Sequence, residues 1–137
     1  MSLLARREHS WLELRHKLAA RGYDDAEVDQ VLAQLEQERL LSDERFAETY
    51  VRTRRERGFG PLRIRAELQE RGVADELIAR HLEAASDTWR ELARDEHRRR
   101  FGDVRPADFK ERARRARFLQ GRGFPVEVVS AVLDEVD

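Results

Sequence analysis

Residues 68–82, which read LQERGVADELIARHL, carry the pattern that decides the fold. The same pattern stands at residues 18–32 (LAARGYDDAEVDQVL) and 119–133 (LQGRGFPVEVVSAVL), so an Arg-Gly pair returns after 50 residues and again after 51. In each copy a Leu precedes the Arg by three positions, an aromatic or aliphatic residue follows the Gly, and aliphatic residues stand seven and eleven positions after the Arg. Self-similarity at this period is typical of repeat architectures.

Each copy predicts two helices joined by a turn. The Gly ends the first helix, because glycine adopts the left-handed conformation there without strain. In the first copy, the first helix begins at Ser10, with Glu13 three residues later as its reciprocal cap, and ends at Gly22. Its second helix begins near Asp24 and carries apolar residues at the spacing of one buried face: Val28, Val31, Leu32 and Leu35.

A third helix follows the first pair. It begins at Ser42, where Leu41 and Phe46 flank the helix start as a hydrophobic staple, and it ends at residues 58–60. We expect its inward face to carry Phe46, Ala47, Tyr50 and Val51. No segment alternates apolar and polar residues between turn signals as a strand does.

The sequence therefore predicts an all-α fold of tandem three-helix repeats, which form an elongated body that can curve. We expect the first repeat at residues 10–58, the second at 59–105, and a partial third repeat of two helices at 106–137. Residues 1–9 are interpreted as the end of a preceding helix or as a truncated N-terminus.

Charge is unevenly distributed along this nearly neutral chain. The 137 residues hold 27 basic and 28 acidic side chains, and all the basic residues except Lys17 and Lys110 are arginine. Residues 24–48 contain nine acids against two arginines, whereas residues 98–122 contain ten basic residues against three acids. An acidic first repeat is thus followed by arginine-rich later repeats.

The sequence shows no machinery for catalysis. It has no Cys, and its four His do not occur at spacings that place two metal ligands on one helix face. Residues 58–61 (GFGP) lack the Lys and Ser or Thr of a phosphate-binding loop. We expect no enzyme, no catalytic residue, no metal and no cofactor. Because no apolar run approaches the roughly 20 residues of a membrane span, we expect a cytoplasmic protein that does not bind membranes.

Three arginine clusters are the candidate residues for binding a partner or a nucleic acid. They are Arg52, Arg54, Arg55, Arg57, Arg63 and Arg65 around Phe59; Arg98, Arg99 and Arg100 beside Phe101; and Arg112, Arg114, Arg115 and Arg117 beside Phe118. For the first two clusters a role in stabilising the helix dipole is an equal alternative. The third lies inside a helix, where self-repulsion favours a facing polyanion, an acidic protein groove or the chain's own acidic segment. The three Phe are candidates for base stacking, although Phe at helical spacing is more often core.

Several motifs together resemble the bacterial RecX family of recombination regulators. They are residues 40–48 (LLSDERFAE), Tyr50-Val51-Arg52, residues 58–61 with Ile64 and Glu67-Leu68, Arg117-Phe118-Leu119, Arg122-Gly123-Phe124, and Arg7-Glu8-His9-Ser10. The resemblance covers the chain from about Leu4 onward. It implies three-helix repeats without catalytic activity that lodge in the groove of RecA filaments and inhibit strand exchange, ATP hydrolysis and SOS co-protease function.

The partner implied is the RecA filament, meaning protein plus single-stranded DNA, bound by a monomer that also has weak affinity for bare DNA. An alternative is a DNA-binding module in which the second helix of a repeat acts as a recognition helix. The acidic helix at residues 24–35 speaks against it, because phosphate would repel that helix. A passive helical scaffold is the third interpretation.

Overall fold

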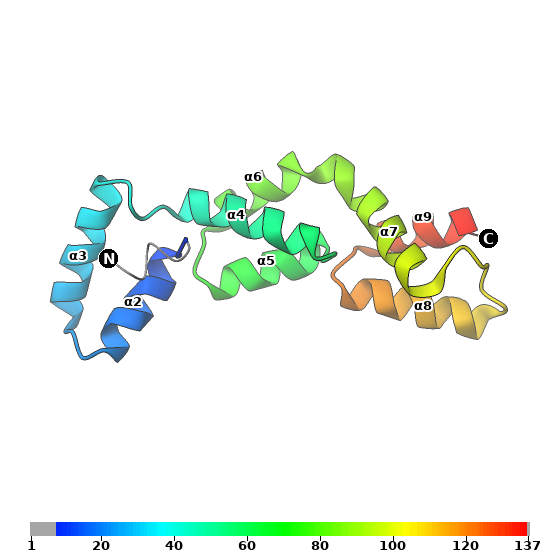
Figure 1. The fold of residues 1–137 in the computed structure, drawn as a ribbon, viewed down its shortest axis with the longest axis horizontal. Helices are drawn as coiled ribbons and strands as arrows, with labels where there is room; N and C mark the ends of the chain where they lie inside the picture. Colours follow the sequence, from blue (N-terminus) through cyan, green and yellow to red (C-terminus); the bar gives the residue numbers. More distant parts are fainter. Residues whose placement is uncertain (1–7, 137) are drawn as a thin grey trace.

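The computed structural model describes residues 8–136, and every regular element in that range is helical. The elements are α2 (Trp11–Ala20), α3 (Asp25–Gln37), α4 (Asp43–Glu56), α5 (Pro61–Glu70), α6 (Asp75–Ala84), the 3₁₀ turn η1 (Ser86–Thr88), α7 (Trp89–Phe101), α8 (Phe109–Gly121) and α9 (Val126–Val136). They form a long body with α2 and α3 at one end and α8 and α9 at the other (Figure 1). The predicted all-α repeat fold is confirmed. The interpretation of residues 1–9 falls mostly outside the described residues.

Local capping explains where the helices begin. The Ser10 hydroxyl accepts a hydrogen bond from the Glu13 N–H, and the Glu13 carboxylate accepts one from the Ser10 N–H, so the predicted capping box is present. Ser42 caps α4 through the N–H of Arg45. Asp24 caps α3 in the same way. These side chains satisfy helix amides that have no partner within the helix.

Apolar side chains gather in two separate cores. The smaller core joins α2 and α3 through Leu14, Leu18, Val28, Leu32, Leu35 and Leu41. The larger core runs from α4 to α9 and includes Phe46, Ile64, Leu68, Ile78, Trp89, Phe124 and Leu133.

Two predictions about buried residues are corrected by these cores. Val31 is 42% exposed, because it lies at the edge of the narrow apolar face of α3. Leu41 and Phe46 do not form one staple, since each joins a different core.

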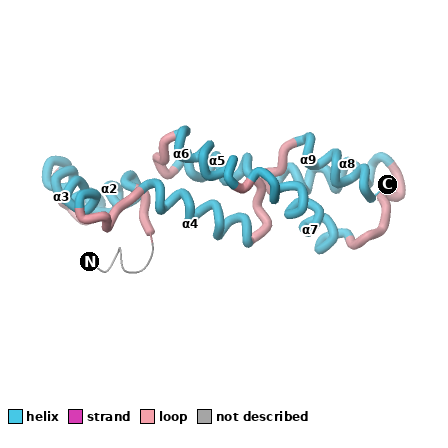
Figure 2. The backbone as a smooth tube through the Cα atoms, turned by 90° about the horizontal axis from the view of Figure 1, so that it is seen from above, coloured by secondary structure: helices cyan, strands magenta, loops and turns pink. Residues whose placement is uncertain are grey.

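Beyond α3 the helices pack in threes. Helix α4 contacts α5 and α6, and α7 contacts α8 and α9. Figure 2 shows α5 and α6 beside α4, and α8 and α9 beside α7. The predicted boundaries at residues 58/59 and 105/106 stay predictions, because packing between helices does not define where a repeating unit begins.

The repeated Arg-Gly turns join neighbouring parts of the body. The carbonyl of Arg71 accepts a hydrogen bond from the Ser10 hydroxyl at 2.8 Å, at the start of α2. The carbonyl of Arg122 accepts one from the N–H of Gly60 at 2.8 Å, at the start of α5. Within residues 8–136 the first copy of the turn makes no such contact, and no atom of that range would lie within 4 Å of a Cβ at Gly22. The second and third copies of the turn therefore each contact another segment of the chain, whereas the first copy is exposed.

Candidate interaction surface

The α4–α5 and α8–α9 loops meet in a close backbone contact, which we call the loop joint (residues 58–62 and 122–123). The N–H of Leu62 donates to the carbonyl of Gly123 at 2.9 Å, beside the bond from Gly60 to Arg122. A Cβ at Gly60 would stand 2.6 Å from the Gly123 carbonyl. Gly123 has φ +105°, and a Cβ there would stand 2.8 Å from the backbone nitrogen of Arg63. Only glycine fits both positions.

A buried acid completes the loop joint. Glu96 of α7 is 3% exposed, and its carboxylate accepts a hydrogen bond from Arg122 at 2.6 Å and pairs with Arg99 at 3.1 Å. Arg122 also donates to the carbonyl of Arg57 at 3.0 Å. A Cβ at Gly58 would overlap the Glu96 carboxylate, which explains a third glycine here. The joint thus ties the end of α4 to α7 and to the α8–α9 loop.

Members of all three predicted clusters come together around three aromatic rings. The guanidinium of Arg54 lies 3.9 Å from the centre of the Phe59 ring, and those of Arg63 and Arg122 lie 4.3 Å from it. The Phe101 and Phe118 rings meet edge to face at 5.5 Å. Arginines also stand over these two rings: Arg100 and Arg122 over Phe118, and Arg114 and Arg115 over Phe101. Arginine–ring stacking is favourable.

Guanidinium groups of the chain itself cover the three Phe rings that were candidates for base stacking. Each ring is approached by at least two guanidinium groups of the same chain. Those groups compete with a base for the ring faces. We therefore assign Phe59, Phe101 and Phe118 to the packing of the arginines, and any partner meets the guanidinium groups rather than the rings.

Arg54 and Arg63 are held by Glu67 of α5. Arg54 binds both carboxylate oxygens, at 2.9 and 2.8 Å, and Arg63 approaches one of them at 3.4 Å. Tyr50 donates its hydroxyl to the same carboxylate at 3.1 Å. Burial acts to raise the pKa of Glu67, but the hydrogen bonds from Arg54 and Tyr50 outweigh it and lower the pKa. Glu67 stays ionised and fixes both arginines.

Arg115 requires a correction, because it is not available to a partner. It is 5% exposed and donates to the carbonyl of Val104 at 2.6 Å and to Glu111 at 3.2 Å. Burial lowers the pKa of His97, and the charge of Arg115, whose guanidinium lies 3.4 Å from the His97 Nε2 atom, lowers it further. Arg115 therefore connects α8 to α7 and to the loop between them, and the adjacency in sequence that groups it with the third cluster does not hold at the surface.

Other members of the clusters have partners within the chain but remain at the surface. Arg112 binds Asp134 at 2.8 Å, and Arg114 binds both oxygens of Glu111 at 2.9 and 2.8 Å. Arg98 lies 3.3 Å from Asp103. Acids of the chain thus compensate these charges, but they are Asp134, Glu111 and Asp103 and not the acidic segment at residues 24–48 that the sequence suggested for the third cluster.

Five predicted arginines have guanidinium groups that make no hydrogen bond, ion pair or ring contact with the rest of residues 8–136. They are Arg52, Arg55, Arg57, Arg65 and Arg117. Three of them stand within six positions at the end of α4 and at its C-cap. An unpaired arginine keeps its full capacity to bind a carboxylate or a phosphate. These five, which we call the free arginines, are the strongest candidates for partner contact.

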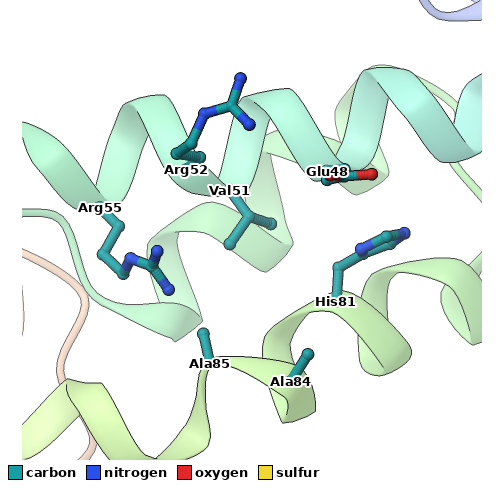
Figure 3. A pocket seen from close by; sticks show the side chains of 7 residues that line it. All are labelled: Glu48, Val51, Arg52, Arg55, His81, Ala84 and Ala85. Carbon is teal, nitrogen blue, oxygen red and sulfur yellow. The ribbon is translucent and has the colours of Figure 1, made fainter.

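A small hollow lies between α4 and α6 next to two of the free arginines. This α4–α6 pocket has a volume of about 200 Å³ and is lined by Glu48, Val51, Arg52, Arg55, His81, Ala84 and Ala85. Figure 3 shows Val51 pointing between the helices, His81 and Glu48 facing each other at one end, and Arg55 near Ala85 at the other. The Nε2 atom of His81 is buried and has no hydrogen-bond partner in the part of the chain that the structure describes.

Arginines hold the pKa of two acids at the C-terminal end well below the ordinary value. Arg94, with Arg90, lowers the pKa of Glu135 to about 2 although desolvation acts against them, and Arg114 and Arg115 lower that of Glu111 to about 2. A carboxylate whose pKa is lowered in the folded state stabilises the fold above its unfolded value and loses that contribution as the pH falls.

We therefore expect the free energy of unfolding to decrease as the pH falls from about 4.5 towards about 2. Urea titrations at stepped pH and low salt measure it. Glu135→Gln should weaken the decrease, because glutamine does not titrate. Glu127→Gln is the matched control, since Glu127 is exposed on the same helix and makes no ion pair within residues 8–136. Equal pH dependence in the two variants contradicts the assignment.

Sequence reasoning missed the groups that organise this surface. The sequence gives Glu67 no role beyond its place in a family motif and gives Glu96 no role at all, and His81 is there one of four histidines without metal-ligand spacing. Arg122 could have been found, because it belongs to the repeated Arg-Gly pair. Nothing in the local sequence reveals that Glu96 is buried against a loop 26 residues away.

Two further classes of site are not seen in the described residues. No group of three or more His, Asp or Glu within residues 8–136 is placed to hold a metal ion. In the same range, no helix is both long and apolar enough to cross a membrane.

The fold and its joints define a tandem three-helix repeat protein with an arginine-rich surface. Family models for the first, second and third three-helix domains of RecX match residues 1–35, 42–82 and 89–133. The chain belongs to the RecX family. The second and third matches correspond to the helix groups α4–α6 and α7–α9.

Relatives and solved structures agree with this membership. The chain is 50% identical to Regulatory protein RecX of Halorhodospira halophila (strain DSM 244 / SL1) over all of its length and 85% of the relative. It is 42% identical to Regulatory protein RecX of Pseudomonas putida (strain GB-1), over all of this chain and 88% of that one. The crystal structure of RecX from Lactobacillus salivarius superimposes with a TM-score of 0.83 over 99% of this chain and 90% of that chain, at 20% identity, and so shares the fold.

Proposed function

We propose that the protein is a non-enzymatic regulator that binds RecA nucleoprotein filaments and inhibits strand exchange, ATP hydrolysis and SOS co-protease function. The observation that carries the proposal is the set of free arginines on a long repeat body of the RecX family. An elongated body contacts several subunits of a filament at once, and unpaired arginines supply anchoring points for acidic groups along it. It acts in the cytoplasm as a monomer and needs no cofactor.

Of the predicted arginines, all but the buried Arg115 remain in the proposed interface. The free arginines make direct contacts. The remaining seven set the positive potential of the surface while they stay bound to their own acids or rings: Arg54, Arg63, Arg98, Arg99, Arg100, Arg112 and Arg114. Single-stranded DNA within the filament is a second source of anionic contacts. The same phosphate contacts would give the protein a weak affinity for DNA without RecA.

RecA-catalysed ATP hydrolysis on single-stranded DNA tests the proposal. We expect substoichiometric protein to lower the hydrolysis rate at least severalfold, because one bound molecule blocks transitions across neighbouring filament subunits. Heat-denatured protein at the same concentration is the control. An unchanged rate at protein concentrations equal to RecA would leave the passive scaffold as the better interpretation.

The alternative function is action through nucleic acid alone. The acidic α3, with no basic residue in its last turn, argues against a recognition helix there. Affinity for bare single-stranded DNA that matches the inhibitory concentration, and falls steeply with salt, would favour this alternative. Binding to the RecA filament that is much tighter than binding to DNA would favour the first proposal.

A further inference from the structure

We propose that the α4–α6 pocket receives a single acidic side chain, Asp or Glu, from a protein partner. This inference rests on the proposed function, because it names the chemistry by which the recombinase filament is recognised. The acidic side chain enters between α4 and α6 with its carboxylate towards the polar lining and its aliphatic stem on the apolar floor.

The pocket contains hydrogen-bond donors that lack acceptors. The guanidinium groups of Arg52 and Arg55 have no partner within residues 8–136. The Nε2 atom of His81 is buried without a hydrogen bond, and the nearest carboxylate oxygen, of Glu44, is 3.9 Å away. With the proton on Nε2, His81 is a third donor. A buried polar atom without a partner costs free energy, which an incoming acceptor removes.

The floor and size of the pocket fit one side chain. Val51 and Ala85 are 4% and 5% exposed, and together with Ala84 they present only aliphatic carbon. Methylene groups of Asp or Glu gain by covering such carbon. The volume of about 200 Å³ lies below the roughly 300–1,000 Å³ of small-molecule sites. A cofactor-sized ligand is therefore not the occupant.

Neighbouring acids favour a protein carboxylate over the phosphates of DNA. Glu48 lines the pocket itself, and Glu44 lies beside His81. On the other side of Arg55 a second hollow is lined by Glu56, Glu91 and Asp95. A chain of phosphates passing Arg55 would run along these acids and be repelled. Glu48 and Glu44 repel either kind of anion, but a single acidic side chain stays within the pocket and does not run along the acids of the second hollow. The apolar floor, in addition, contributes nothing to phosphate binding.

A steric variant tests whether the pocket is entered. Ala84→Phe fills the hollow without changing charge, and we expect it to weaken co-sedimentation with RecA filaments on single-stranded DNA at least tenfold. Arg55→Glu should weaken it equally while leaving affinity for bare DNA unchanged. Ala79→Phe, on an exposed position of the same helix outside the pocket lining, is the control and should bind as the wild type does. Circular dichroism confirms that all three fold.

Zero-length crosslinking identifies the occupant. A carbodiimide joins an amine to a carboxylate only on contact. The only side-chain amines of this chain are Lys17 and Lys110, so a new crosslink from a lysine at position 55 can be distinguished by peptide mapping. We expect Arg55→Lys to form an amide with an Asp or Glu of RecA in the filament, and Arg21→Lys, at an exposed position outside the proposed interface, to form markedly less. If the wild type binds filaments and Ala84→Phe binds them equally well, the pocket inference is wrong and the proposed function stands. Equal crosslinking at the two introduced lysines has the same meaning. If Arg55→Glu lowers the affinity for bare DNA as much as the affinity for the filament, the group that Arg55 binds is a phosphate and not an acidic side chain. Absence of wild-type binding overturns both this inference and the proposed function.

Discussion

Gly123→Ala is expected to destabilise the larger core by about 2 kcal/mol beyond the roughly 1–2 kcal/mol that a left-handed alanine costs. Gly123 has φ +105°, and the added Cβ would stand 2.8 Å from the backbone nitrogen of Arg63 and 3.0 Å from the carbonyl of Gly60. Backbone on both sides leaves no flexible side chain to give way. Urea unfolding followed by Trp89 fluorescence, in a Trp11→Phe background, measures the loss in the core to which Trp89 belongs.

Gly22→Ala is the matched control for this prediction. It occupies the same place in the first copy of the repeat, at φ +94°, but no atom lies within 4 Å of its Cβ position. It should cost only the backbone strain, roughly 1–2 kcal/mol, as followed by Trp11 in a Trp89→Phe background. Equal losses at the two positions would mean that the loop joint contributes nothing to stability.

Replacing the three free arginines at the end of α4 should abolish most filament binding with little loss of stability. For Arg52, Arg55 and Arg57→Gln together, we expect the dissociation constant to rise at least tenfold, about 1.4 kcal/mol. The free energy of unfolding should fall by no more than about 1 kcal/mol, because these guanidinium groups have no partner within residues 8–136 and stabilise the fold only through the dipole of α4. Co-sedimentation with RecA filaments and urea unfolding give the two quantities.

Arg54→Gln provides the opposite case on the same helix. Arg54 binds Glu67 through two hydrogen bonds with 18% of its side chain exposed, so its loss should cost about 1–3 kcal/mol of stability. Its effect on filament affinity should be smaller than that of the triple variant. If the triple variant binds as the wild type does, the end of α4 is not the interface, whatever Arg54→Gln does.

The sequence predicted the helices well because their signals are local. The capping box at Ser10, the cap at Ser42 and the repeated Arg-Gly turns each act within a few residues, and each is present as expected. The predictions for Val31 and for Leu41 with Phe46 failed where packing across helices decides burial. A helical pattern shows that a face is apolar but does not say which core receives it.

The interaction surface was predictable only as a set of charges. Clusters of arginine are visible in the sequence, whereas the acids that engage them lie 13 residues away for Arg54 and 22 for Arg112. Separations of that size are fixed by tertiary packing and not by helix periodicity. The distinction between free arginines, engaged arginines and the buried Arg115 therefore needed the three-dimensional arrangement.

The separation of the two cores has a further consequence for the dynamics of the molecule. Leu41 closes the α2–α3 core, whereas Phe46, five residues later, belongs to the core that extends to α9. Few apolar contacts cross between them, so the first helix pair is a cooperative unit of its own and opens at a lower free energy than the remainder. The contacts that hold this pair to the rest are largely polar, such as the hydrogen bonds from the Ser10 hydroxyl to the Arg71 carbonyl and from the Trp11 N–H to Asp43. We therefore expect the N-terminal helix pair to open first under denaturing conditions, while α4–α9 unfold later as one body.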